Sequence, residues 1–186
     1  MPHISVPAAE LNTRLDRLRC AMTEKDPAWS MLLLDNTLDM YYFTGTMQDG
    51  ALVVTPDQAT LFVRRSFDVA KDESAFADIR PMGSFRGIKE VYPDIPETVY
   101  VAAKTMTLQK LSMLNKHLPF SPKPVDGVLS GLRSVKSAYE LDCMRESGRL
   151  HRYVIEGLAP AFLREGVSEA RLYSEICTAI VDRGGM

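Results

Sequence analysis

Side chains suited to binding a small molecule or a protein surface concentrate in the segment Met40–Gly50. Three aromatic residues, Tyr41–Phe43, come first, and a polar loop bounded by glycines at both ends follows them. Aromatic rings with polar tips, next to a loop on a rigid sheet, suit the lining of a pocket or an interface. A buried helical turn with Tyr41 and Phe43 in the core is the favoured interpretation of the aromatics. For the loop Thr46–Asp49 both interpretations stay open.

No other local motif carries recognisable chemistry. The histidines His3, His117 and His151 lack the close spacing with which one helix or loop binds a metal ion. The glycines form neither a G-x-G-x-x-G nor a P-loop pattern, and no G-x-S-x-G motif occurs. Asp72 and Glu73 fall on an expected helix surface, where a solvated charge is the ordinary explanation. Local sequence therefore predicts no catalytic residue and no metal ligand, although a site assembled from distant residues would not be visible at this level.

Composition narrows the class of protein. The chain has 22 basic and 24 acidic residues, a net charge of −2, and therefore no basic field that would attract nucleic acid. No apolar run approaches the roughly 20 residues that cross a bilayer, and the N-terminus lacks a signal-peptide pattern. Cys20, Cys143 and Cys177 are odd in number and far apart, as is typical of reduced thiols. We therefore expect a cytoplasmic protein that binds neither nucleic acid nor membrane.

Strand and helix patterns alternate over the first part of the chain. Leucines and a methionine at spacings of four, three and four predict a first helix, and a wholly apolar run at 31–34 predicts a buried central strand. Such alternation predicts an α/β fold with a mixed β-sheet flanked by helices. The expected helices cover 8–25, 67–76, 85–92 and a stretch capped by Thr107, and the expected strands cover 31–34, 50–55, 60–64, 79–82, 98–102 and the proline-rich edge at 119–124.

The pattern changes after residue 130. Ser137 and Glu140 form a capping box ahead of a long amphipathic helix, and Ser168 precedes a second one that Gly184 and Gly185 terminate. Two consecutive long helices without a strand between them indicate a new structural unit. The expected organisation is a domain at 1–130, a linker at 131–136, and helices of a second, truncated domain at 137–186.

Several segments resemble one known family. YYFTG after a short apolar strand, followed by the hairpin GALVVTPDQATLFVRR, resembles the N-terminal domain of the creatinase, prolidase and aminopeptidase P group. LRSVKSAYELDCMRESGRL resembles the linker and first helix of that group's pita-bread catalytic domain, and LREGVSEARLYSEICTAIVDRGG resembles its next turn and helix. The segments occur in the order of the family.

The resemblance implies a parent that hydrolyses Xaa-Pro bonds with two divalent metal ions, Mn, Co or Zn. In the family the metal ligands are two aspartates, a histidine and two glutamates, and they follow the segment that matches Gly166–Gly185. None of those positions occurs in this chain, so these residues alone are expected to be inactive. Two alternatives stay open: a non-catalytic module that binds peptides or proteins on a peptidase-like fold, and part of a creatinase-like hydrolase of a small molecule.

The resemblance also implies a homodimer, in which the N-terminal domain reaches over the partner's active site and gates access of proline-containing peptides. Arg64 and Arg65 end the hairpin and are candidate carboxylate binders, because a guanidinium can hold a carboxylate through two parallel hydrogen bonds. The candidate gating residues are Tyr42, Thr46, Met47, Gln48, Asp49, Arg64 and Arg65.

Overall fold

The computed structural model describes residues 5–184 of the chain. This part divides into two compact units, of which the first ends at Val135 and the second begins at Lys136. The first unit contains all the β-strands of the described residues, and the second is helical.

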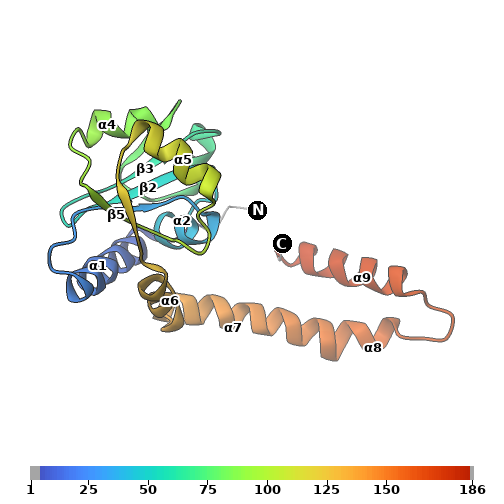
Figure 1. Cartoon of the computed structure of the whole chain (residues 1–186). Helices are drawn as coiled ribbons and strands as arrows, with labels where there is room; N and C mark the ends of the chain where they lie inside the picture. The colour runs from blue at the N-terminus through green and yellow to red at the C-terminus, as the bar shows by residue number, and fades with distance from the viewer. Residues whose placement is uncertain (1–4, 185–186) are drawn as a thin grey trace. The chain divides into compact units, whose positions relative to one another are not determined.

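A six-stranded mixed sheet forms the centre of the first unit (Figure 1). Its strands lie in the order β4-β3-β2-β1-β5-β6, and β2 alone runs antiparallel to its neighbours. The expected α/β fold with a mixed sheet and flanking helices is confirmed. The strands are β1 Leu32–Leu34, β2 Gly50–Val54, β3 Ala59–Val63, β4 Ile79–Pro81, β5 Thr98–Val101 and β6 Ser121–Pro124.

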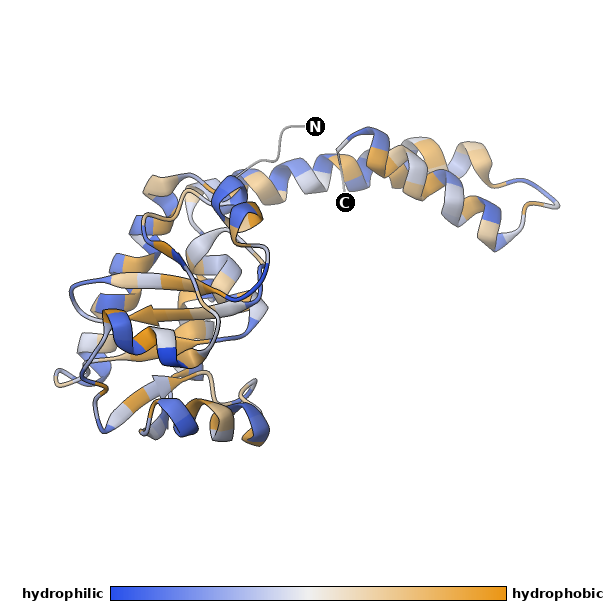
Figure 2. Ribbon diagram, turned by 90° about the horizontal axis from the view of Figure 1, so that it is seen from above, coloured by the Kyte–Doolittle hydropathy of each residue, from blue (hydrophilic) through white to orange (hydrophobic). Residues whose placement is uncertain are grey.

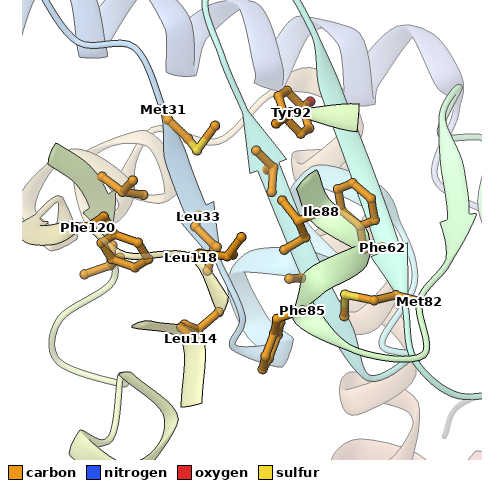
Figure 3. Packing of buried hydrophobic residues seen from close by; sticks show 14 residues of the cluster. Met31, Leu33, Phe62, Met82, Phe85, Ile88, Tyr92, Leu114, Leu118 and Phe120 are labelled. Carbon is orange, nitrogen blue, oxygen red and sulfur yellow. The ribbon is translucent and has the colours of Figure 1, made fainter. Parts of the chain in front are cut away.

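One face of the sheet packs under the 3-10 turn η1 (Phe85–Gly87) and the helices α4 (Ile88–Val91) and α5 (Leu108–His117). Since side chains alternate along a strand, every second residue of β1, β2 and β5 points to this face. Figure 3 shows these residues packing against aromatic and aliphatic side chains from the helices and the loops beside them. The core on this side consists of Met31, Leu33, Ala51, Val53, Phe62, Met82, Phe85, Ile88, Tyr92, Val99, Val101, Leu114, Leu118 and Phe120.

The opposite face lies against α1 (Ala8–Lys25), α2 (Thr37–Thr44) and α6 (Asp126–Ser134), as Figure 1 shows. The predicted apolar stripe of α1 is buried: Leu11, Leu15, Leu18 and Met22 are at most 5% exposed. A further short helix, α3 (Phe67–Glu73), connects β3 to β4 and contacts β4.

The sequence did not predict α6. Its glycines, Gly127 and Gly131, lower its intrinsic helix propensity. Tertiary packing outweighs this deficit, because Leu129 and Leu132 are buried and α6 packs against α1. Arg133 of α6 also forms an ion pair with Asp39 of α2. These contacts anchor the last helix of the first unit.

Asp26, which follows α1, connects that helix to the sheet. Its carboxylate accepts hydrogen bonds from the Tyr100 hydroxyl at 2.6 Å, the Lys123 ammonium at 2.9 Å and the backbone N–H of Ala28 at 3.1 Å. These three hydrogen bonds, with that from Tyr100 the strongest, lower the pKa of Asp26 from 3.8 to about 2. The folded state thus favours the ionised carboxylate more than the unfolded chain does.

The lowered pKa of Asp26 predicts a specific pH dependence. Because the folded-state pKa lies below the ordinary value of 3.8, the stabilisation is complete above about pH 5 and is lost as the pH falls through about 2. Asp26→Asn should therefore lower the melting temperature at pH 7, and its deficit should shrink between pH 4 and 2. Asp57→Asn, a change of an exposed carboxylate in the β2–β3 turn, is the control and should show no deficit at either pH.

The second unit consists of α7 (Ala138–Arg152), the π-helix η2 (Tyr153–Leu158), α8 (Ala159–Phe162) and α9 (Glu169–Asp182). The predicted capping box of Ser137 and Glu140 is present, and Ser168 caps α9 as expected. The π-helix ends two residues before Pro160, whose nitrogen cannot donate a helical hydrogen bond. Gly184, at φ 83°, lies in the left-handed conformation that ends many helices.

This second unit has almost no core of its own. Val154 is the only buried residue between 136 and 184, although α9 packs against α8 and η2. Figure 2 shows hydrophobic residues recurring along these helices. The exposed large apolar residues are Leu141, Met144, Tyr153, Ile155, Leu163, Tyr173 and Val181. Exposed apolar patches often mark a surface that contacts another molecule.

Candidate functional site at the Thr46–Asp49 loop

The loop Thr46–Asp49 connects α2 to β2, and both of its ends are fixed by local structure. Asn36 caps α2 by accepting a hydrogen bond from the backbone N–H of Asp39 at 2.9 Å. Gly45 ends α2 in the left-handed conformation, at φ 75°, which glycine adopts at little cost. Gly50 then begins β2 opposite Val63.

Tyr42 lies inside the first unit. Its side chain is 7% exposed, and its hydroxyl donates to the carbonyl oxygen of Leu132 at 3.4 Å. The Arg14 guanidinium lies 4.4 Å from the ring centre and donates to the Tyr42 carbonyl at 2.7 Å. Phe43 is also buried, as expected, whereas the expectation of a buried Tyr41 is wrong: Tyr41 is 39% exposed. Tyr42 thus packs the helix that leads into the loop.

Glu73 of α3 holds the first half of the loop. The Thr46 hydroxyl donates to Oε2 of Glu73 at 2.8 Å, and the Gln48 amide donates to the same oxygen at 3.4 Å. The backbone N–H of Gln48 donates to the Thr46 hydroxyl at 3.3 Å. Treating Glu73 as a solvated surface charge was wrong, because it is partly buried and contacts the loop. No sequence pattern points to this contact, which joins residues 27 positions apart.

Asp49 and Arg64 hold the second half of the loop. Both Nε and an Nη of Arg64 donate to Oδ2 of Asp49, at 2.9 and 2.5 Å, and the backbone N–H of Arg64 donates to the Asp49 carbonyl at 2.8 Å. The hairpin register places these residues opposite each other, one position beyond the pair Gly50 and Val63. Arg64 therefore already holds a carboxylate, that of its own chain.

The remaining candidates are exposed. Met47 is 63% exposed, and Arg65 is also exposed. Two residues of α2, Leu38 and Tyr41, add apolar surface, and Leu38 is 63% exposed. Because they are three residues apart, they lie on one side of the helix. Leu38 was not among the predicted site residues, although its spacing from Tyr41 is visible in the sequence. The structure thus gives a loop held at both halves, with apolar side chains and one arginine directed to solvent.

Removing the Glu73 carboxylate, which holds the loop Thr46–Asp49, should make this loop open more often. Glu73→Ala leaves the buried Thr46 hydroxyl without its acceptor, and a lost hydrogen bond to a charged group weakens local structure by about 1.5 kcal/mol. Amide hydrogen exchange over Thr46–Asp49 should then accelerate roughly tenfold. Glu90→Ala, at an exposed position of α4, is the matched control and should leave these amides unchanged. Equal exchange in both variants would contradict the anchoring role.

The described part of the chain has no cluster of side chains placed to bind a metal ion: residues 5–184 contain no group of three or more His, Cys, Asp or Glu side chains that could hold one. None of the helices over this range is both long and apolar enough to span a membrane.

Comparison with known proteins gives the site its context. The sequence pattern of the Creatinase/Prolidase N-terminal domain family matches residues 14–135. No curated protein sequence matches the chain significantly. Among solved structures, a Xaa-Pro dipeptidase from Bacillus anthracis is similar with a TM-score of 0.80 at 20% identity, covering 94% of this chain and 50% of its own.

Two further structures are informative. Dipeptidase PepE from Mycobacterium ulcerans has a TM-score of 0.76 at 26% identity, over 97% of this chain and 51% of its own. The creatinase/prolidase N-terminal domain of an X-Pro dipeptidase from Streptococcus pyogenes has a TM-score of 0.54 at 19% identity, over 64% of this chain and 98% of its own. This chain therefore spans about half the length of the two whole dipeptidases.

Proposed function

Because this chain belongs to the creatinase/prolidase N-terminal domain family, we propose that it is the N-terminal, non-catalytic part of a Xaa-Pro peptidase of the prolidase or aminopeptidase P type. The observation that carries the proposal is the similarity to dipeptidases over nearly the whole chain, the second unit included. In this proposal the parent hydrolyses Xaa-Pro bonds. Two divalent metal ions, Mn, Co or Zn, held by residues outside this chain, supply the activated water.

Within the parent, the first unit dimerises and gates the active site. The anchored loop Thr46–Asp49 presents Met47 to solvent, and Leu38 and Tyr41 add exposed apolar surface on α2. Large apolar side chains on the surface of a soluble protein favour a protein contact. Arg65 remains exposed beside this hairpin and suits a substrate carboxylate better than Arg64, which Asp49 already occupies.

The unpaired thiols suit a reducing compartment. Cys20, Cys143 and Cys177 are all free, and the first two are exposed. Exposed thiols persist where glutathione and thioredoxin keep them reduced. We therefore place the protein in the cytoplasm.

The reading frame of the gene provides the direct test of the peptidase assignment. A frame that continues past Met186 into an Asp, Asp, His, Glu, Glu series should give a product that hydrolyses a Xaa-Pro dipeptide with Mn²⁺ or Co²⁺. The chain printed here should show no turnover above a metal-only blank. A frame without that series would favour the non-catalytic binding module, and turnover of creatine in place of the dipeptide would favour the creatinase-like alternative.

Association of the chain tests the proposed dimer surface. Leu38→Glu combined with Met47→Glu should weaken self-association at least roughly tenfold in sedimentation equilibrium, because each charge would desolvate against an apolar partner. Leu108→Glu is the matched control, since Leu108 is 86% exposed on α5. Dissociation caused by Leu141→Glu with Met144→Glu instead would locate the contact in the second unit and refute this surface.

A further inference from the structure

A pocket on the first unit has no role in the proposed function. It lies between the last turn of α5 and the turn that follows β4, and its volume is about 240 Å³. Met82 and Phe85 line it from the β4–η1 turn, and Met113 lines it from α5. Met82 and Phe85 are nearly buried, whereas Met113 is 47% exposed. The pocket thus has a fixed apolar floor and an adjustable apolar wall.

Three basic side chains, Arg64, Lys116 and His117, also line the pocket, and Gly83 and Ser84 complete the lining. The Asp49 carboxylate neutralises Arg64, because its Oδ2 accepts a hydrogen bond from Nε of Arg64 at 2.9 Å. Lys116 and His117 form no ion pair with any carboxylate of residues 5–184, so the pocket carries a net positive charge. An adjoining hollow, which shares Met82, Gly83 and Ser84 with the pocket, is lined by one acid, Glu90, together with Arg86. A negatively charged ligand complements this lining.

The pocket favours a singly charged anion over a phosphate. Lys116 and His117 lie in the last turn of α5, where the free carbonyl groups carry a partial negative charge that opposes a dianion. Phosphate sites in proteins use the opposite end of a helix, where backbone N–H groups point at the ligand. One ammonium above an apolar floor instead matches a carboxylate that carries a hydrocarbon chain.

We propose that this pocket binds a small monocarboxylate with a short apolar chain. The apolar chain packs on Met82, Phe85 and Met113, and the carboxylate contacts Lys116 and His117 at the mouth. The pocket volume equals that of roughly eight water molecules, which limits the hydrocarbon chain of the ligand to about six carbons. This inference does not depend on the peptidase assignment, because it is argued only from the residues that line the pocket.

The test is a titration of the full chain with hexanoate, followed by ¹⁵N–¹H NMR. Amides of the β4–η1 turn and of the last turn of α5 should shift saturably, with a Kd on the order of 1 mM for a ligand of this size. Two control ligands separate charge from apolar contact. Hexanol has the six-carbon hydrocarbon chain but no charge, and acetate has the carboxylate but almost no hydrocarbon chain. Both should bind at least about fivefold more weakly than hexanoate. Equal binding of hexanol, or tighter binding of inorganic phosphate, would overturn the proposal.

Two variants locate the ligand in the pocket. Lys116→Gln removes the uncompensated charge from an exposed position, and Met113→Ser removes the exposed apolar wall. Each should weaken hexanoate binding by about fivefold or more. Lys25→Gln removes an exposed charge at the end of α1 and should leave the affinity unchanged. Unchanged affinity in Lys116→Gln, or an equal loss in Lys25→Gln, would place the binding elsewhere and refute the assignment.

Discussion

Replacing Gly50 with alanine should destabilise the first unit by about 3 kcal/mol, because the new methyl group would collide with the neighbouring strand. A Cβ at this position would overlap the Phe62 carbonyl oxygen and would lie only 3.0 Å from the carbonyl carbon. Both atoms belong to the backbone of β3, so neither can rotate away. The hairpin would have to separate, and with it the pair of Asp49 and Arg64. Urea unfolding of the full chain measures the loss.

Gly131→Ala is the control for this substitution. Gly131 lies inside α6, where an added Cβ meets no atom within 4 Å, so alanine should stabilise the helix by up to about 1 kcal/mol. Opposite signs for the two variants are the expected result. A Gly50→Ala protein as stable as the wild type would show that the strands separate at this point without cost.

The two glycines that bound the loop illustrate how far sequence reasoning reaches. A polar stretch between Gly45 and Gly50 is enough to predict a loop. The reasons for the two glycines differ, however, and only the structure separates them: Gly45 adopts a positive φ, whereas Gly50 leaves room for the opposing backbone.

Elements with a strong local pattern were predicted well, and those that depend on tertiary contacts were not. The apolar strand at 32–34 and the helix Ala8–Lys25 follow from spacing alone. Helix α6 was missed because its packing against α1, rather than its propensity, makes it a helix. The π-helix η2 continues the apolar spacing of α7, so the pattern could not distinguish the two helix types.

The candidate site shows the same division. The exposure of Met47 and Arg65 is compatible with a loop of polar character, but the anchor Glu73 lies on a different helix and has no sequence signature. The pair of Asp49 and Arg64 lies between these two cases, because the sequence predicts it once the hairpin turn is known. Given the hairpin turn, counting residues outward from Val54 and Ala59 brings Asp49 opposite Arg64, so this pair was predictable from register.

The second large effect is expected at Lys110, which compensates a buried charge. Asp35 directly follows β1, and its side chain is 3% exposed. The Lys110 ammonium lies 2.8 Å from Oδ2 of Asp35 and donates to the Asp35 backbone carbonyl at 3.1 Å. Lys110→Met would leave the carboxylate buried without its counter-charge. Since Lys110 is 33% exposed and water would partly replace it, we expect a loss of about 2 kcal/mol, below that for a fully buried pair.

Two comparisons separate charge compensation from general packing. Lys104→Met changes an exposed lysine in the turn before α5 and should leave the urea midpoint unchanged. Combining Asp35→Leu with Lys110→Met should recover most of the loss, because an apolar pair of similar volume has no charge to desolvate. Equal losses in Lys110→Met and Lys104→Met would show that Asp35 does not need its partner. Recovery in the double variant would show that Lys110 compensates the buried charge of Asp35 and that the ion pair itself is not essential for stability.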